Sequence, residues 1–241
     1  MIKKHYTESV IQIKKYYLNK LASENEPSST EEIIRSIFAI SKALSPNQKI
    51  IISHKPIKGF VGKKIPQTTG PKPRGLWYSC GNDWIDWNIS EGYLPLDNHD
   101  FFGGKFIYEI ELDMNEIRQI KSKGELERFS AHRGAKEQRS RLREPQNYDS
   151  IYWDLVAQDY SGIEICPYIS ECRYSVPWYY AWDVASGCIW DSNAFKSIKL
   201  LASRTEGGDN WKINKSVWDV PRHFDEDEAT SVSHNDKLAL A

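Results

Sequence analysis

The sequence predicts an α+β fold, with a helical N-terminal region followed by a core of several short strands. Apolar residues recur at helical spacing through residues 6–40, whereas from Lys49 onward they form short β-branched or alternating runs typical of strands. These strands do not alternate regularly with helices, which argues against a parallel βαβ series. With 241 residues, 40% of them hydrophobic, the chain is long enough for one sizeable core.

Residues 1–48 are expected to form the N-terminal helical region. Residues 6–22 place apolar side chains at helical intervals with lysines between them, and Pro27 lies in the polar break that follows. Thr30 offers an N-cap for a second helix whose first turn is acidic. We expect this helical pair to pack on the core as a lid, with a module that docks a partner or inhibitor as the alternative.

Residues 49–202 contain the predicted strands. The run from Ile50 to Ile52 is β-branched and short, as in a buried strand, and it ends at Ser53 and His54. Residues 76–78 form a second short strand, and residues 105–112 alternate apolar and polar side chains as a half-buried strand does. Further strands are expected at residues 163–168, 179–184, 188–190 and 197–201.

Two short helices are expected between these strands, and an extension after them. Asp113 can cap a helical stretch that turns Ile117 and Ile120 inward, and a weaker helix is expected at residues 125–129. Residues 203–241 form a C-terminal extension that ends in an acidic, frayed tail.

Charge and hydropathy limit the classes of partner. The formal net charge of −1 gives the whole chain no attraction to nucleic acid or to an anionic membrane. Two segments are locally basic: residues 55–75 hold six basic residues and no acid, and residues 132–143 form a second basic run. We find neither a run of the ~18–20 apolar residues that a membrane helix needs nor a secretory signal. A cytoplasmic protein without a membrane partner is therefore expected.

The cysteines and the aromatic residues set two further expectations. The four cysteines show no C-x-x-C pair, so no metal site is expected and all four are predicted to be reduced thiols. Nine Trp, 13 Tyr and 8 Phe form either a thick core or a cleft that stacks flat rings such as bases or nicotinamide.

Three segments carry the candidate chemistry. A buried strand delivers His54 at its end, a strand opened by Gly75 contains Trp77, and Glu164 stands between two isoleucines in a third strand. A carboxylate inside an apolar strand needs an explanation, because such groups are rarely buried unless they are paired or functional. Since Ile163 and Ile165 share one face of the strand, Glu164 points to the other, towards either solvent or a cleft.

The order of these segments resembles the His–Tyr–Glu signature of the ADP-ribosyltransferase superfamily. The family's second element often reads Gly-Ile-Tyr-Phe-Ala, and Gly75-Leu76-Trp77-Tyr78-Ser79 aligns with it residue by residue. Residues 106–112 and 179–190 also resemble bacterial and phage-associated members, and the resemblance covers residues 49–202. It implies a split β-sheet core. Two departures stand out: Trp77 replaces the usual Tyr, and Lys55-Pro56 follows the His in place of Gly-Thr or Gly-Ser.

The resemblance implies NAD as co-substrate and Glu164 as the catalytic residue. Breaking the bond between nicotinamide and ribose develops positive charge on the sugar, and a nearby carboxylate stabilises that charge in the transition state. The cofactor-binding residues implied are His54, Lys55, Trp77, Tyr78 and Ser79.

Most of these residues have an expected contact. His54 can hydrogen-bond a ribose hydroxyl of the adenosine half, and Trp77 offers a flat face to the nicotinamide ring, with the Ser79 hydroxyl nearby. Basic residues of the loop at 55–75, such as Lys55 and Arg74, can meet the pyrophosphate, although a solvated basic loop explains them equally well.

The expected activity is mono-ADP-ribosyl transfer to a macromolecule, as in a toxin or an anti-phage effector. RNA or DNA is slightly preferred over protein as the acceptor, because the two basic segments accompany surplus aromatic residues. An inhibitor or antitoxin protein is a possible partner. The alternatives are an NAD glycohydrolase, a non-enzymatic module that binds a nucleotide or nucleic acid, and an RNA 2′-phosphotransferase, whose expected arginine pattern is not evident.

Overall fold

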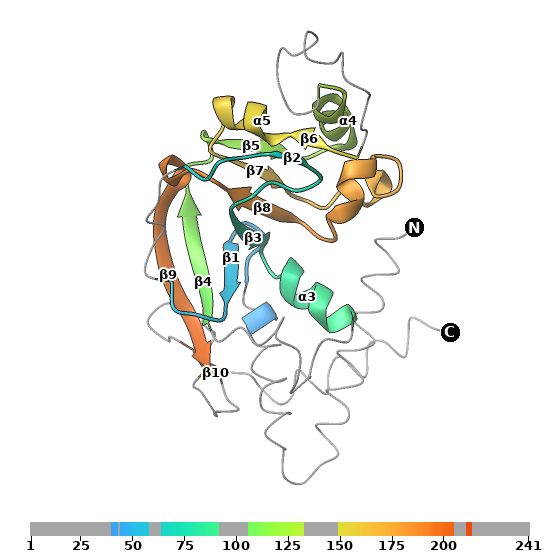
Figure 1. Ribbon diagram of the computed structural model, residues 1–241. Helices are drawn as coiled ribbons and strands as arrows, with labels where there is room; N and C mark the ends of the chain where they lie inside the picture. The colour runs from blue at the N-terminus through green and yellow to red at the C-terminus, as the bar shows by residue number, and fades with distance from the viewer. Residues whose placement is uncertain are drawn as a thin grey trace, which may run out of the picture.

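An eight-stranded sheet forms the centre of the protein in a computed structural model that describes residues 40–42, 44–57, 64–91, 106–132, 149–204 and 211–213. The strand order is β10-β9-β4-β1-β3-β8-β7-β5 (Figure 1). The strand bounds are β1 Lys49–Ser53, β3 Leu76–Cys80, β4 Phe106–Leu112, β5 Ile117–Ile120, β7 Gly162–Ile165, β8 Ser186–Ile189, β9 Phe195–Arg204 and β10 Trp211–Ile213.

The sheet is mostly antiparallel and strongly twisted. Only β5 and β7 pair in parallel among the strands of this sheet that the structure describes. In Figure 1, β1, β4 and β9 run roughly vertically while β5, β7 and β8 run roughly horizontally, so the direction changes between β1 and β8. A separate two-stranded ribbon pairs β2 (Thr69–Gly70) with β6 (Ile151–Tyr152).

Short helices cover parts of the sheet. They are α3 (Asp83–Ser90), α4 (Lys123–Ala131), α5 (Trp153–Asp159) and the 3-10 turns η1 (Ser170–Cys172), η2 (Pro177–Ala181) and η3 (Ser192–Ala194). Helix α4 begins where it does because the Ser122 hydroxyl accepts a hydrogen bond from the Glu125 N–H, and the Glu125 carboxylate accepts one from the Lys121 N–H. The first contact satisfies an N–H of the first helical turn that has no partner inside the helix, and the second satisfies the N–H of the residue before the cap.

Hydrophobic clusters pack on opposite faces of the central strands. Residues paired directly across strands share a face, and alternation along each strand sends the next residue to the other face. One face holds the tryptophan cluster, which includes Trp153, Trp178, Trp182 and Trp190 and packs against Trp77. The other face holds what we call the Tyr78 cluster, with Ile51, Tyr78, Tyr108, Ile110 and Ile189 among its members.

The structure confirms the α+β class and most of the predicted strands. Those at residues 50–52, 76–78, 105–112, 163–168, 188–190 and 197–201 overlap observed strands, and the helix at 125–129 lies within α4. The predicted helical stretch after Asp113 is wrong, since Ile117–Ile120 is strand β5. The predicted strand at 179–184 is also wrong: Pro177 starts η2, whose tight turn buries Trp178 and Tyr179.

Several sequence predictions lie outside the described residues. They are the N-terminal helical pair except for the helical residues 40–42, most of the basic run at 132–143, residues 58–63 of the basic loop, and the acidic tail. Within the described parts of the chain, no helix is both long and apolar enough to cross a membrane.

The prediction of four reduced thiols is wrong for two of the cysteines. Cys80 at the end of β3 and Cys166 just after β7 form a disulfide, with their Cα atoms 6.5 Å apart. Cys172 and Cys188 are buried free thiols. Because stable disulfides form mainly in oxidising compartments, the cysteines no longer argue for a cytoplasmic location.

Candidate functional site

Glu164 lies in the core rather than at solvent or in an open cleft. It is the third residue of β7 and only 4% exposed. Its neighbours Ile163 and Ile165 belong to the tryptophan cluster, so Glu164 faces the Tyr78 cluster. Since a buried carboxylate is costly without compensation, the residues that contact it decide what it can do.

Lys49 supplies the opposite charge. Its Nζ lies 2.6 Å from Oε2 of Glu164, and the two side chains are 15% and 5% exposed. Two strands, β3 and β8, separate β1 from β7 in the sheet order. Three strand spacings span ~14 Å of a flat sheet, so the two long side chains must reach towards each other across β3 and β8.

Tyr78 makes the second contact with the same carboxylate oxygen. Its hydroxyl donates a hydrogen bond to Oε2 of Glu164 at 3.0 Å, and the tyrosine is completely buried. Burial, and then the charge and hydrogen bond of Glu164, raise the pKa of Tyr78 well above its ordinary value. Tyr78 therefore remains a proton donor to Glu164 throughout the physiological pH range.

Gly187 makes this contact possible. Tyr78 and Glu164 both pair with Gly187 of β8, so the three residues form one row across three strands. A Cβ atom at Gly187 would lie 2.1 Å from Cζ of Tyr78. The tyrosine ring thus occupies the space that a side chain on β8 would fill, and its hydroxyl reaches the next strand.

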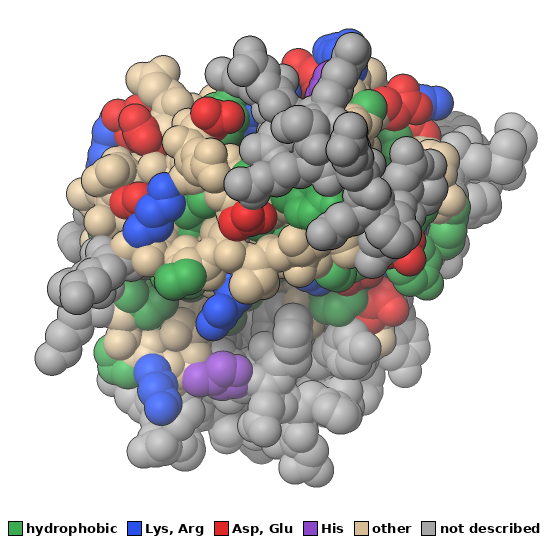
Figure 2. All heavy atoms as spheres, turned by 45° about the horizontal axis from the view of Figure 1, so that its top comes forward, with side chains coloured by type: hydrophobic (Ala, Val, Ile, Leu, Met, Phe, Trp, Pro, Cys, Tyr) green, Lys and Arg blue, Asp and Glu red, His purple; other side chains and the backbone are tan. Residues whose placement is uncertain are grey.

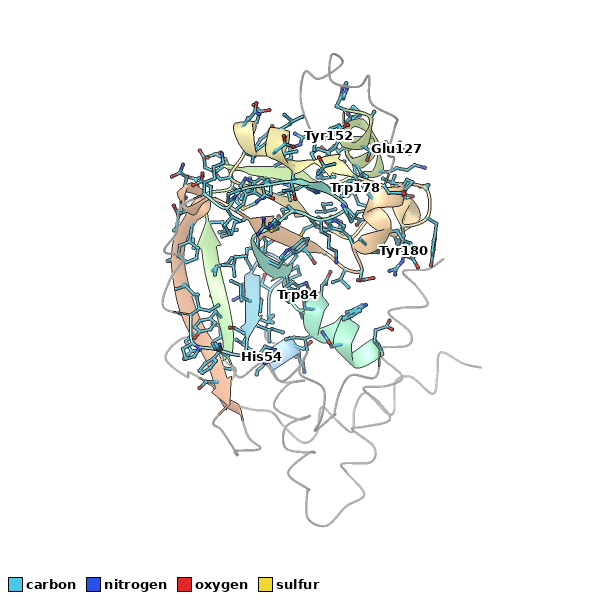
Figure 3. The ribbon with its side chains drawn as sticks, viewed as in Figure 1. His54, Trp84, Glu127, Tyr152, Trp178 and Tyr180 are labelled. Atoms are coloured by element: carbon cyan, nitrogen blue, oxygen red, sulfur yellow. A yellow bond between two sulfur atoms is a disulfide. The ribbon has the colours of Figure 1, made fainter. Side chains whose placement is uncertain are left out.

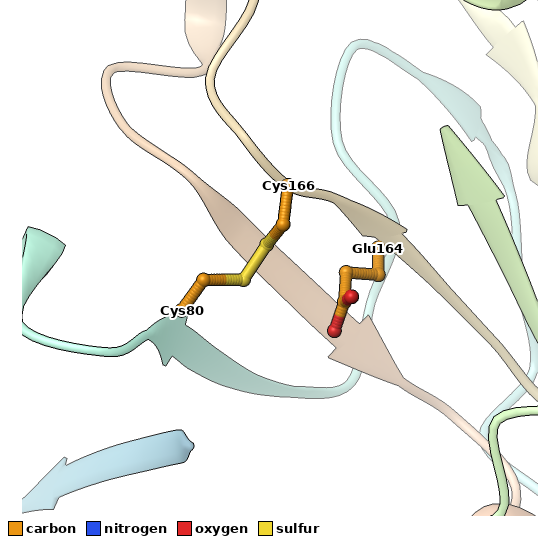
Figure 4. A group of neighbouring side chains, drawn as sticks. All are labelled: Cys80, Glu164 and Cys166. Carbon is orange, nitrogen blue, oxygen red and sulfur yellow. A yellow bond between two sulfur atoms is a disulfide. The ribbon is translucent and has the colours of Figure 1, made fainter. Parts of the chain in front are cut away.

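The disulfide borders the same carboxylate. Figure 4 shows the Cys80–Cys166 bridge beside Glu164, which precedes Cys166 by two residues. The two sulfur atoms and a carboxylate oxygen of Glu164 all lie within 4.8 Å of one another. Cys80 is 5% exposed and Cys166 is partly buried, so solvent reaches this group from the Cys166 side.

Lys49 is one of the residues that line a surface hollow of about 530 Å³. The residues that line it are Asn47, Gln48, Lys49, Glu109, Ile110, Glu111, Leu112, Met114, Ser197 and Lys199. Among the residues that the structure describes, Lys49 both lines this hollow and contacts Glu164. The volume of the hollow falls in the ~300–1,000 Å³ range of small-molecule sites.

His54 and Lys55 lie away from Glu164. Both are exposed just beyond the end of β1, where the Ser53 hydroxyl accepts a hydrogen bond from the Lys55 N–H. His54 is five residues along the chain from Lys49, or about 16 Å of extended strand. Figure 3 shows His54 near the lower end of the sheet, remote from the layer that contains Trp178.

Trp77 and Ser79 lie on the opposite face of the sheet from Glu164. Trp77 packs edge-on against Trp182 with ring centroids 4.9 Å apart, and Lys72 Nζ lies 5.5 Å from the centroid of the Trp77 ring. The Ser79 hydroxyl is buried, accepting a hydrogen bond from the Trp84 N–H and donating one to the Gly81 carbonyl. Of the five predicted cofactor-binding residues, only Tyr78 contacts Glu164.

Sequence reasoning missed Lys49 and Gly187. A lysine directly before an apolar run looks like an ordinary strand boundary, and its pairing with Glu164 depends on a strand order that local pattern does not reveal. Gly187 did carry a signal, because a glycine inside a strand often marks the close approach of another group.

Comparisons of the chain with protein-family models, with curated proteins and with solved structures find no match. A function must therefore be argued from the motifs and from the geometry around Glu164. That geometry consists of a buried carboxylate with two partners, an adjoining disulfide, and a hollow that starts at Lys49.

Proposed function

We propose that this protein is an NAD-dependent mono-ADP-ribosyltransferase in which Glu164 is the catalytic carboxylate. The observation that carries the proposal is the contact between Tyr78 and Glu164. The motifs assign both residues to one site although they are 86 residues apart, and their side chains meet at 3.0 Å.

The proposed chemistry uses the carboxylate to stabilise positive charge on a sugar. The bond between the ribose C1′ and the nicotinamide nitrogen breaks, and nicotinamide leaves with the bonding electrons. A nucleophilic atom of the acceptor then bonds to C1′ and gives up its proton. Lys49 and Tyr78 both contact Oε2, so neither contact uses Oε1 of Glu164. They fix the carboxylate before the reaction begins, which reduces the cost of reorganisation in the transition state.

The hollow beside Lys49 is the proposed route by which NAD approaches Glu164. Ile110, Leu112 and Met114 give it an apolar lining suited to a flat ring. Lys49 and Lys199 can meet the pyrophosphate, while Glu109 and Glu111 offset their charge. This route replaces the predicted stacking of nicotinamide on Trp77, because that ring lies on the other face of the sheet.

A nucleic acid, RNA or DNA, is the proposed acceptor in preference to protein. The support is the basic segment at 55–75, of which Lys55, Lys64, Lys72 and Arg74 are described and exposed. On the face drawn in Figure 2, acidic and basic side chains are interspersed among the described residues. Attraction to phosphates is therefore local, and the labelling of a nucleic-acid acceptor falls steeply as salt rises.

One observation favours a non-enzymatic binding module as the second candidate. Glu164 is 4% exposed and already paired with Lys49, as a purely structural ion pair would be. In that case Glu164 serves only to stabilise the sheet, and the protein binds a nucleotide or nucleic acid without consuming NAD. An NAD glycohydrolase differs from both, because it consumes NAD with water as the acceptor.

Incubation of the full chain with labelled NAD separates these candidates. Parallel reactions contain RNA, DNA, a protein lysate or no acceptor, each at low and at high salt. Label that becomes covalently attached to RNA or DNA supports the proposal, and nicotinamide release without an acceptor identifies a glycohydrolase. If NAD remains intact in every reaction, the transferase proposal is rejected in favour of the binding module.

A further inference from the structure

Three potential metal ligands meet on the face of the sheet that holds the Tyr78 cluster. The Sγ atoms of Cys80 and Cys166 and a carboxylate oxygen of Glu164 lie within 4.8 Å of one another (Figure 4). Cys80 ends β3, whereas Glu164 and Cys166 come from β7 and the residues just after it. Cysteine thiolates and carboxylates are both zinc ligands, with Zn–S and Zn–O distances of about 2.3 and 2.0–2.2 Å.

We propose that reduction of the Cys80–Cys166 disulfide converts this group into a zinc site. A thiol or phosphine reductant supplies two electrons, the S–S bond breaks, and each sulfur first becomes a thiol. Zinc binding then displaces one proton from each thiol. Cys80, Cys166 and Glu164 provide three ligands, and a water molecule completes the tetrahedron from the partly exposed Cys166 side. This inference does not depend on any reaction of NAD.

The backbone separation suits both states. The Cα atoms of Cys80 and Cys166 are 6.5 Å apart, towards the upper end of the 4.4–6.8 Å usual for disulfides. Two thiolates on one tetrahedral zinc ion stand about 3.8 Å apart, which follows from the Zn–S distance. Rotation of the two side chains can supply this separation.

The negative charges of the reduced and deprotonated site favour the binding of a divalent cation. Two thiolates and the Glu164 carboxylate would place three negative charges against the single positive charge of Lys49. A Zn²⁺ ion makes the buried group neutral, whereas without it the thiols must keep their protons. Lys49 and Tyr78 already hold the carboxylate and become the outer partners that orient a ligand.

The other two cysteines provide a matched control within the same chain. Cys172 and Cys188 belong to the tryptophan cluster on the opposite face. Burial raises the pKa of Cys188 well above its ordinary value, which disfavours the thiolate that zinc requires. Replacement of Cys188 by serine is therefore expected to leave the zinc site intact.

The test titrates the reduced full-length protein with Co²⁺ under anaerobic conditions and then displaces the Co²⁺ with Zn²⁺. One equivalent of Co²⁺ should produce sulfur-to-metal charge-transfer absorption in the parent and in Cys188→Ser. Cys80→Ser and Cys166→Ser should lose it, and Glu164→Gln should bind zinc more than about tenfold more weakly, since loss of outer partners alone costs about 10–100-fold. The oxidised parent should bind no Co²⁺ through sulfur.

A second measurement uses only the parent protein, so it tests the site even if some variants fail to fold. The reduced parent is alkylated with and without Zn²⁺, and the modified cysteines are located by peptide mass mapping. Protection of Cys80 and Cys166, but not of Cys172 and Cys188, supports the site. The proposal is overturned if Zn²⁺ protects neither Cys80 nor Cys166, or if the Co²⁺ spectrum persists in folded Cys80→Ser.

Discussion

Tyr78 and Glu164 meet across an intervening strand because the residue between them is a glycine. Both residues pair with Gly187, and the Tyr78 ring crosses β8 at the position where a side chain would otherwise stand. The hydroxyl then reaches the Glu164 oxygen that Lys49 also contacts. The pairing of a buried carboxylate thus depends on the absence of one Cβ atom.

Replacement of Gly187 by alanine should displace Tyr78 and destabilise the protein. The added Cβ would lie 2.1 Å from Cζ of a ring that is completely buried and has little room to move. Overpacking of this kind costs about 1–3 kcal/mol, occasionally more. Urea denaturation of Gly187→Ala and of a control, Gly70→Ala, measures the effect. At Gly70 the nearest atom to the new Cβ is 3.8 Å away, so equal stabilities of the two variants would contradict the prediction.

Replacement of Tyr78 by phenylalanine should lower stability through the lost hydrogen bond to Glu164. Removal of the hydroxyl leaves the buried carboxylate one donor short, at a cost of roughly 1–3 kcal/mol. The control is Tyr174→Phe, because Tyr174 is 72% exposed. Its free energy of unfolding should change by less than about 0.5 kcal/mol.

Tyr78 also predicts how stability declines in alkali. Burial and Glu164 raise its pKa above the ordinary 10.0, so the unfolded chain loses this proton at lower pH than the folded protein. The stabilisation that results from this raised pKa is fully present below pH 10 and is lost as the pH rises above it. For one group, the free energy of unfolding then falls by about 1.4 kcal/mol per pH unit. Tyr78→Phe should therefore show a shallower loss of stability above pH 10. An unchanged slope in that variant would show that Tyr78 does not hold its proton in the fold.

Removal of Lys49 should cost more than removal of Lys49 and Glu164 together. Lys49→Met leaves Glu164 buried without its opposite charge, and breaking a buried pair in this way costs about 3–5 kcal/mol. The double variant Lys49→Met/Glu164→Gln leaves no unpaired charge and should recover part of that loss. A double-mutant cycle by chemical denaturation gives the coupling energy.

The exposed pair Lys123–Glu127 provides the reference for that cycle. Its side chains are about half exposed, at 50% and 51%, with a separation of 3.8 Å. Such pairs contribute about 0–1 kcal/mol, so Lys123→Met should have little effect. A coupling energy for Lys49 and Glu164 as small as that for the exposed pair would show that solvent screens the contact.

The disulfide should stabilise the protein through the long segment that it closes. Cys80 and Cys166 are 86 residues apart, a separation for which chain-entropy estimates approach 4–5 kcal/mol and measured values are typically 2–4 kcal/mol. A reductant, with a chelator present to exclude metals, should lower the Tm of the parent by several degrees. The Tm of Cys80→Ser/Cys166→Ser should not respond to the reductant, and a parent that also fails to respond would contradict the bridge.

The strands were predictable where the residue pattern has one explanation. Residues 50–52 are β-branched and residues 106–112 alternate apolar and polar side chains. Both patterns predict a strand without reference to the rest of the fold, and both segments are strands. The stretch from Ile117 to Ile120 was wrongly predicted to be helical, because two isoleucines three residues apart lie on one face of a helix. In the strand, this spacing places Ile117 in the Tyr78 cluster and Ile120 in the tryptophan cluster, so each face of β5 buries one isoleucine.

The site was predictable only in part, because faces and strand order are global properties. Glu164 stood out locally as a carboxylate within an apolar strand, and Tyr78 lay in the right motif. Trp77 precedes Tyr78 by one residue, and this single step along β3 sends its ring to the opposite face. The contact of Lys49 with Glu164 could be predicted only from the strand order β1-β3-β8-β7, which is determined by long-range strand pairing.

The central claim concerns Glu164, and nicotinamide release from NAD tests it most directly. The assay compares the folded parent, Glu164→Gln and a control, Glu171→Gln, whose carboxylate is exposed. We expect turnover by the parent and the control and a loss of about 100–1,000-fold in Glu164→Gln, the usual effect of removing one stabiliser of transition-state charge. Equal rates in all three proteins, with circular dichroism showing each to be folded, would contradict the assignment of Glu164 as the catalytic residue.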